Sequence, residues 1–155
     1  MPGLLNLKNG RAFATGATPY FVGNIGEPTA GRLMIRLTIE GQPLVAAIDT
    51  GSPFVICHPD LAEPLKPRLT DPLGKTRLLI RGIEYRGDTY LMSAEIMADD
   101  GDDISLTVIV FIPQLDPGEV WTLPSFVGLE GMLQRMRFAV DPDASLFYFG
   151  PLGEA

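Results

Sequence analysis

The sequence is poor in the residues that build disulfides and transition-metal sites, with one cysteine and one histidine in 155 residues. Cys57 has no second cysteine to pair with, which fits a reducing compartment. His58 follows it directly, but adjacent residues of a strand point to opposite faces, so we expect no thiol–imidazole couple. We therefore predict a buried Cys57, a surface His58, no metal and no cofactor.

Positive charge and long apolar runs are also scarce. The chain has 12 Lys and Arg against 19 Asp and Glu, a formal net charge of −7, and its arginines are scattered. Binding to a phosphate backbone needs a clustered positive face, so we expect no nucleic-acid partner. The longest apolar stretch, residues 107–113, is far below the ~20 residues that span a bilayer. With no signal pattern at the start, the expectation is a soluble cytoplasmic protein without membrane contact.

What the sequence does contain is enough apolar residues for one core, arranged in short runs. Hydrophobic residues make up 46% of the chain and charged residues 20%, a globular balance. Residues 32–40 alternate in polarity and predict a strand with one buried face. Residues 44–48 are apolar throughout and predict a strand buried on both faces. Further strands are expected at residues 54–57, 77–80, 90–97, 104–112, 138–140 and 146–149.

One helix and one arm complete the expected organisation. Leu129, Met132, Leu133 and Met136 recur at helical spacing, which predicts a short helix over residues 129–136. Four prolines exclude a long regular element between residues 59 and 75, although a short helical turn there is compatible with them. Residues 1–31 are rich in Gly, Thr, Pro and Ala, with one strand-like piece at 20–22, and are expected to form an N-terminal arm or pro-segment before a domain of residues 32–155.

Two short motifs carry the candidate chemistry. Asp49-Thr50-Gly51 follows the doubly apolar run and precedes a second apolar run, so an acid lies on a tight loop between two buried strands. Near the other end, Phe126-Val127-Gly128 precedes the expected helix.

An Asp-Thr-Gly triplet after a buried strand, with two hydrophobic residues and a glycine late in the chain, resembles the retropepsin-like aspartic peptidases over about residues 32–149. This resemblance implies an all-β, closed, barrel-like fold with one short C-terminal helix. It implies that Asp49 is the catalytic acid, that Thr50 clasps its counterpart across a dimer axis, and that Gly51 leaves room for the nucleophilic water. The strand ending at Val127 and Gly128 would fix this loop.

The chemistry of this family needs two carboxyl groups that share one proton, because the attacking water loses a proton while the peptide carbonyl gains one. The sequence holds a single Asp-Thr-Gly and no Asp-Ser-Gly. A second copy must therefore supply the second acid, so we expect a homodimer. The expected substrate is a peptide or protein segment in extended conformation.

Three further expectations concern the surroundings of Asp49. The hydroxyl of Ser52 either donates to the outer oxygen of Asp49, which favours the ionised form, or satisfies an amide of the turn. Residues 82–87 have the composition of a hairpin tip where the family has its flap, which makes Gly82, Ile83, Glu84 and Tyr85 candidate substrate-binding residues. The family pairs its terminal strands between copies, so residues 146–149 are expected at the dimer interface.

Two alternatives stay open. A binding or scaffold protein could retain the fold without turnover, although an intact Asp-Thr-Gly argues against this because a buried carboxylate is costly to desolvate. A metal-dependent hydrolase could use the acidic cluster of Asp99, Asp100, Asp102 and Asp103. That cluster lacks the spacing of a calcium loop, so a solvated turn is the expected structure.

Overall fold

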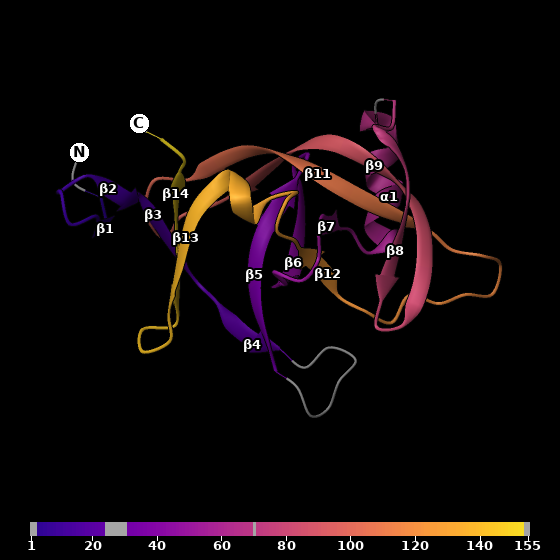
Figure 1. Cartoon of the computed structure of the whole chain (residues 1–155), viewed down its shortest axis with the longest axis horizontal. Coiled ribbons are helices and arrows are strands. Elements are labelled where there is room, and N and C mark those ends of the chain that lie inside the picture. Colours follow the sequence, from indigo (N-terminus) through magenta and orange to yellow (C-terminus); the bar gives the residue numbers. More distant parts are fainter. Residues whose placement is uncertain (1–2, 24–30, 70, 154–155) are drawn as a thin grey trace.

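The computed structural model describes residues 3–23, 31–69 and 71–153 and is mainly β, as predicted (Figure 1). The strands are β1 (Leu5–Asn6), β2 (Ala12–Ala14), β3 (Gly16–Pro19), β4 (Phe21–Gly23), β5 (Arg32–Ile39), β6 (Gln42–Ile48), β7 (Val55–Ile56), β8 (Gly74–Ile80), β9 (Ile83–Ile96), β10 (Asp100–Gly101), β11 (Ile104–Gln114), β12 (Ser125–Val127), β13 (Met136–Asp141) and β14 (Leu146–Pro151). The helical elements are α1 (Pro59–Leu65) and the short 3₁₀ turns η1 (Lys66–Arg68) and η2 (Leu133–Arg135).

The larger sheet has the strand order β4-β5-β6-β12-β7-β11-β9-β8. Strand β5 also pairs with β9, through Thr38 opposite Glu95 and Ile39 opposite Ala94. This pairing links strands from the two halves of the sheet, so β5, β6, β12, β7, β11 and β9 form a ring. The strands thus close into a ring, whereas the barrel-like form expected from the sequence stays a prediction.

Several strands of the ring are buried on both faces. Neighbouring residues such as Ala46 and Ala47 on β6, or Val127 and Phe126 on β12, belong to two different apolar clusters. The main cluster takes residues from the ring and from β14, including Phe147 and Phe149. The second cluster contains Met34, Ala47, Ile56, Phe111, Trp121, Leu123 and Phe126. Burial on both faces at Ala46 and Ala47 fits the lack of polar alternation just before Asp49, whereas Val45, earlier in the same run, is exposed.

The predicted helix over residues 129–136 is wrong, since this segment contains turns and the 3₁₀ turn η2. Its backbone groups bond elsewhere: the carbonyl of Gly131 accepts from the amide of Ile109 (3.1 Å), and the amide of Gly131 donates to the carbonyl of Pro53 (2.8 Å). Because these groups are bonded to other segments, they cannot form the regular N–H(i) to C=O(i−4) hydrogen bonds of an α-helix. Met132, Leu133 and Met136 are nevertheless buried, so the apolar spacing located core positions but not their secondary structure.

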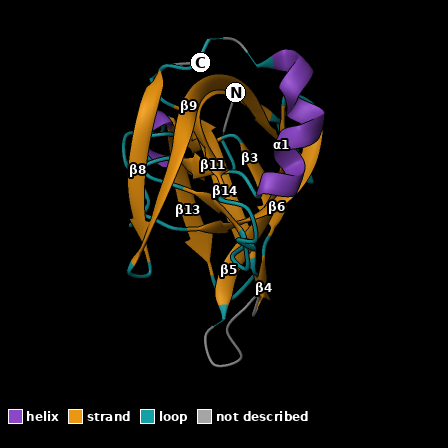
Figure 2. Cartoon of the chain, turned by 90° about the vertical axis from the view of Figure 1, so that its right-hand side faces the viewer, coloured by secondary structure: helices purple, strands orange, loops and turns teal. Residues whose placement is uncertain are grey.

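The α-helix lies mid-chain instead, at Pro59–Leu65. Pro59 occupies the first turn, where its missing amide hydrogen costs nothing, and Nδ1 of His58 accepts from the amide of Asp60 (3.1 Å) to cap the helix. In Figure 2 the helix covers one side of the strands. No helix among the described residues is long and apolar enough to cross a membrane.

The N-terminal segment contains more strand structure than its composition indicated. Strand β3 lies between β10 and β14 in a four-stranded sheet, whose order is β10-β3-β14-β13 (Figure 1). Its short sequence of small residues has low β propensity, so the sequence pattern did not predict this strand. Gly16 is required there, because a Cβ atom would stand 2.2 Å from the carbonyl oxygen of Asp102. The division of the chain at residue 31 stays a prediction.

Strand β14 is hydrogen-bonded on both edges within the chain, to β3 and to β13. It therefore has no free edge for a strand of a partner copy. The expectation that residues 146–149 lie at a dimer interface stays a prediction, and pairing between copies through β14 would require β3 or β13 to be displaced.

Substitution of Ala17 tests whether β3 is part of the folded unit. Ala17 is 2% exposed, so Ala17→Asp would bury an unpaired carboxylate and should lower the free energy of unfolding by about 3 kcal/mol or more. Val22→Asp, at a position on β4 that is 67% exposed, is the control and should change it by less than about 0.5 kcal/mol. Urea denaturation measures both, and equal stabilities would show that β3 does not contribute.

Candidate active site

Asp49 lies directly after β6, on the loop that leads to β7. Strand β12 lies between these two strands: it runs parallel to β6, with Val127 opposite Ile48, and antiparallel to β7, with Phe126 opposite Ile56. The two motifs that stand almost eighty positions apart in the sequence are therefore neighbours in space.

Backbone hydrogen bonds fasten the Asp49 loop to the segment after β12. The amide of Asp49 donates to the carbonyl of Val127 (3.0 Å). The carbonyl of Ser52 accepts from the amide of Leu129 (2.7 Å), and that of Pro53 accepts from the amide of Gly131 (2.8 Å). The loop is thus held at its beginning, middle and end, which fixes the position of the acid.

Gly128 permits this close contact. A Cβ atom at this position would lie 2.2 Å from the carbonyl oxygen of Phe54 and 2.6 Å from that of Ser52. Both neighbours are backbone atoms of the acid-bearing loop, which cannot move aside as a flexible side chain can. A side chain at residue 128 would therefore push the loop away from β12.

The carboxylate of Asp49 is half-buried and partly ordered by its own loop. Its Oδ1 accepts from the amide of Gly51 (3.0 Å), and its carbonyl accepts from the amide of Ser52 (3.1 Å). Thr50 and Gly51 are exposed beside it. The loop thus presents an acid with one oxygen engaged by the backbone, next to an uncovered turn.

The expected hydrogen bond from Ser52 to Asp49 is not formed. The hydroxyl of Ser52 donates instead to the carbonyl of Phe54 (3.1 Å), and the side chain is 7% exposed. The tight turn directs the hydroxyl forward along the chain to a carbonyl, so the structure shows neither a bond to Asp49 nor the alternative, a bond to an amide of the turn.

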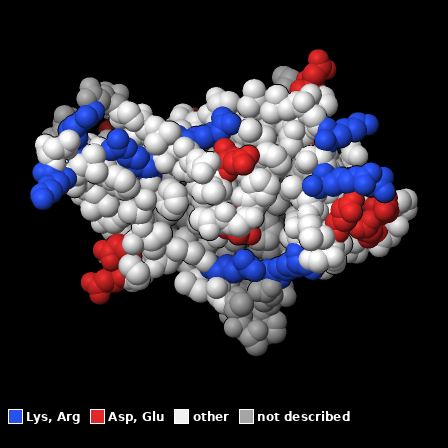
Figure 3. All heavy atoms as spheres, viewed as in Figure 1, with Lys and Arg blue, Asp and Glu red and all other residues white. Residues whose placement is uncertain are grey.

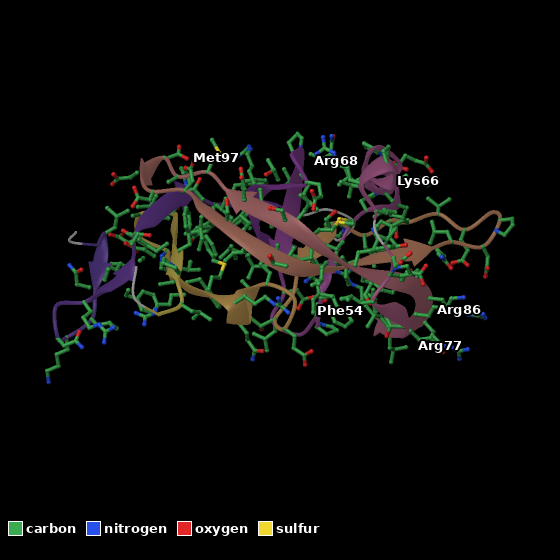
Figure 4. The ribbon with its side chains drawn as sticks, turned by 90° about the horizontal axis from the view of Figure 1, so that it is seen from above. Phe54, Lys66, Arg68, Arg77, Arg86 and Met97 are labelled. Atoms are coloured by element: carbon green, nitrogen blue, oxygen red, sulfur yellow. The ribbon has the colours of Figure 1, made fainter. Side chains whose placement is uncertain are left out.

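The hairpin predicted at residues 82–87 is tighter than its composition indicated. Strands β8 and β9 are joined by Arg81 and Gly82, whose φ angles of +52° and +80° fit a two-residue turn. Ile83, Glu84 and Tyr85 therefore lie on β9 itself rather than in a loop. On the outward face Arg77 pairs with Glu84 (3.4 Å), and Figure 4 shows Arg77 and Arg86 pointing away from the hairpin.

The inner face of the hairpin reaches the Asp49 region through the second apolar cluster. Leu78, Ile80 and Tyr85 pack against that cluster, as does Phe54 from the Asp49 loop. Tyr85 is half-buried, with its ring edge against Trp121 at 5.0 Å between centroids, so it is not the solvent-facing residue of a turn. Sequence reasoning missed the closeness of Trp121 and Phe54 to this hairpin, because no local pattern marks a contact between separate loops.

Cys57 and His58 do not form a catalytic couple. Cys57 is fully buried in the main cluster, and this burial raises the pKa of its thiol from 9.0 to about 12. His58 is half-buried and uses Nδ1 to cap α1.

The acidic cluster after β9 is engaged in separate local contacts. Oδ1 of Asp99 accepts from the hydroxyl of Thr18 (3.0 Å), and Oδ1 of Asp103 accepts from the amide of Ala98 (2.7 Å). Within residues 3–23, 31–69 and 71–153, no three His, Cys, Asp or Glu side chains are grouped so as to hold a metal ion.

The sequence matches no protein-family model, and no curated protein matches it. Among solved structures, the chain is similar to the crystal structure of a retropepsin-like aspartic protease from Rickettsia conorii. The two share 16% sequence identity, the match covers 86% of this chain and 90% of that chain, and the TM-score is 0.48.

Replacement of Gly128 tests the close contact between β12 and the Asp49 loop. Gly128→Ala should lower the free energy of unfolding by about 2 kcal/mol or more, because its Cβ overlaps backbone atoms. Gly74→Ala is a matched control, since a Cβ at residue 74 meets nothing within 4 Å. Chemical denaturation measures the stability of both variants. An unchanged midpoint for Gly128→Ala would contradict the described packing.

The reactivity of Cys57 tests its burial. At pH 8 iodoacetamide should alkylate the native thiol about a thousandfold more slowly than the thiol in urea, because the thiolate fraction falls tenfold for each pH unit between the two pKa values. Mass spectrometry over time measures this ratio. Equal rates with and without urea would show that the thiol is accessible.

Proposed function

We propose that the protein is an aspartic endopeptidase that works as a homodimer. The observation that carries the proposal is the Asp49 loop: a half-buried carboxylate is held by β12 on one side, and the adjacent Thr50 and Gly51 are exposed on the other. A structure that fixes an acid so firmly beside an open turn is suited to present it to a second copy.

In the proposed mechanism, the two Asp49 carboxyl groups face each other across a two-fold axis and hold one water between them. Like charges ~3 Å apart do not both ionise, so the pair carries one proton. The ionised carboxylate accepts a proton from the water as it attacks the peptide carbonyl, while the protonated partner donates to the carbonyl oxygen. The resulting tetrahedral intermediate collapses, the C–N bond breaks, and the amine leaves with a proton from the pair.

Assembly in this proposal uses the face around the acid rather than exchanged terminal strands. Both edges of β14 are hydrogen-bonded within the chain, to β3 and to β13, so β14 offers no free edge to a strand of a partner copy. Thr50 and Gly51 are exposed and adjoin Asp49, which makes them the contacts nearest the axis. In this role Thr50 would fix the relative position of the two acids.

The proposed substrate is a peptide in extended conformation, held under the β8–β9 hairpin. The hairpin tip carries Ile83, which is 55% exposed and stands opposite Ile80 on the inner face. An exposed apolar side chain at this tip is available to pack on a bound peptide. On the face shown in Figure 3, Lys and Arg are interspersed with Asp and Glu among uncharged residues. We also propose a cytoplasmic location, on the basis of the lone cysteine.

Substitution of the acid tests the activity. Asp49→Asn should reduce cleavage of denatured casein by about a thousandfold or more, because an amide cannot exchange the proton that the mechanism needs. Asp100→Asn, the same change at an exposed carboxylate of β10, should leave cleavage unchanged. Pepstatin should inhibit the wild type, and sedimentation should give a dimer.

Equal cleavage by Asp49→Asn would exclude Asp49 as the acid. A folded wild-type dimer that cleaves nothing would favour the alternative of a peptide-binding or scaffold protein with a retained peptidase fold.

A further inference from the structure

Ser125 is the first residue of β12, and its side chain is almost completely buried, at 3% exposed. Its hydroxyl oxygen accepts a hydrogen bond from the backbone amide of His58 (2.9 Å). His58 follows β7 and directly precedes α1, so it is remote from Ser125 in sequence. A single side-chain bond therefore joins the start of β12 to the junction between β7 and α1.

This bond lies where the chain enters β12 from a loop. After Glu119, residues 120–124 form no backbone hydrogen bond within the part of the chain that the structure describes. Pro124, immediately before the strand, has no amide hydrogen to donate. Ser125 is also the first residue to pair with β6, opposite Ala46. The start of β12 is thus fixed at Ser125 and not by the loop before it.

The hydroxyl also distinguishes the observed register of β12 from its neighbours. Successive side chains of a strand lie on opposite faces, so a slip of one residue would exchange the apolar clusters into which Phe126 and Val127 pack. The same slip would bring Pro124 or Phe126 to the amide of His58 in place of Ser125. Neither of those side chains can accept a hydrogen bond. The bond from His58 is therefore made by the side chain only in the register that the structure has.

The amide of His58 is a firm attachment point because the backbone around it is held on both sides. The preceding amide, of Cys57, donates to the carbonyl of Phe111 on β11 (3.2 Å). The imidazole of His58 caps α1, since its Nδ1 accepts from the amide of Asp60 (3.1 Å). A strand tied to this amide is consequently tied to both β11 and α1.

The far end of β12 holds the acid. The carbonyl of Val127 accepts from the amide of Asp49 (3.0 Å), and the next bond, from the amide of Leu129 to the carbonyl of Ser52 (2.7 Å), continues the attachment. All three residues of β12 pair with β6, so no unpaired residue lies between Ser125 and Val127. A displacement at the start of the strand therefore reaches the acid-bearing loop through paired backbone.

We infer that Ser125 is a positioning residue, whose hydroxyl fixes the start and register of β12 and thereby the place of Asp49. It acts through the backbone of β12 and has no part in the proton transfers. The kinetic consequence rests on the proposed peptidase function, whereas the placement of the loop is a property of the folded chain.

Amide hydrogen exchange of the full-length protein, followed by NMR, tests the placement without turnover. Ser125→Ala removes the acceptor, so the amide of Asp49 should exchange about three- to tenfold faster, the effect of one lost hydrogen bond on the opening of β12. Ser125→Thr keeps the hydroxyl and should restore the wild-type rate, because Ser125 borders a hollow of about 420 Å³ that can take the added methyl group.

Thr18→Val is the matched control. Thr18 is 8% exposed, and its hydroxyl donates to Oδ1 of Asp99 (3.0 Å) in a different sheet, so this variant also loses one buried hydroxyl bond. It should leave the exchange of Asp49 unchanged. Equal acceleration of Asp49 in Thr18→Val and Ser125→Ala would overturn the inference, because a general loss of stability would then account for it. An unchanged rate in Ser125→Ala would overturn it as well.

Kinetics on denatured casein give the second readout. Ser125→Ala should lower kcat about three- to tenfold and leave KM within about twofold, because the acid moves while the contacts to the peptide remain. Ser125→Thr and Thr18→Val should retain the wild-type kcat. A raised KM with an unchanged kcat would overturn the positioning role. If Asp49→Asn retains activity while exchange of Asp49 is accelerated in Ser125→Ala alone, the proposed function fails and the placement of the loop by Ser125 stands.

Discussion

The structure around the acid depends on one arrangement, the insertion of β12 between β6 and β7. This three-residue strand supplies the carbonyl of Val127 to the amide of Asp49 and brings Gly128 against the backbone of the loop. Without it, β6 and β7 would be joined only by the loop, and a tight turn with an exposed Thr50 and Gly51 would have no fixed position. The glycine and the two apolar residues before it therefore hold the loop that carries Asp49.

Burial on both faces makes this insertion stable. Phe126 and Val127 are adjacent, yet they pack into different apolar clusters on opposite sides of the ring of strands. A strand of three residues forms few hydrogen bonds, so its side chains must supply most of its stabilisation by removing apolar surface from water. The second cluster also contains Trp121, and Tyr85 of the β8–β9 hairpin packs against it. The packing that holds β12 therefore extends to this hairpin.

Both edges of β14 in the four-stranded sheet are used within one chain. Strand β3 pairs with β14 within the same chain, and β13 occupies the other edge. An intramolecular pair forms at a high effective concentration, so it is favoured over exchange of the same strand with a second copy.

The sequence by itself determined the acid loop, the apolar strand before it and most of the later strands, because local apolar patterns and Asp-Thr-Gly are properties of consecutive residues. Tertiary structure decided what depends on distant partners. Residues 129–136 have helical spacing, but the backbone groups of Gly131 bond to Pro53 and Ile109 instead. Strand β3 has little β propensity of its own and forms because β14 and β10 lie on either side. The hydroxyl of Ser52 bonds to Phe54, and Trp121 meets Tyr85, because the fold sets which groups are within reach.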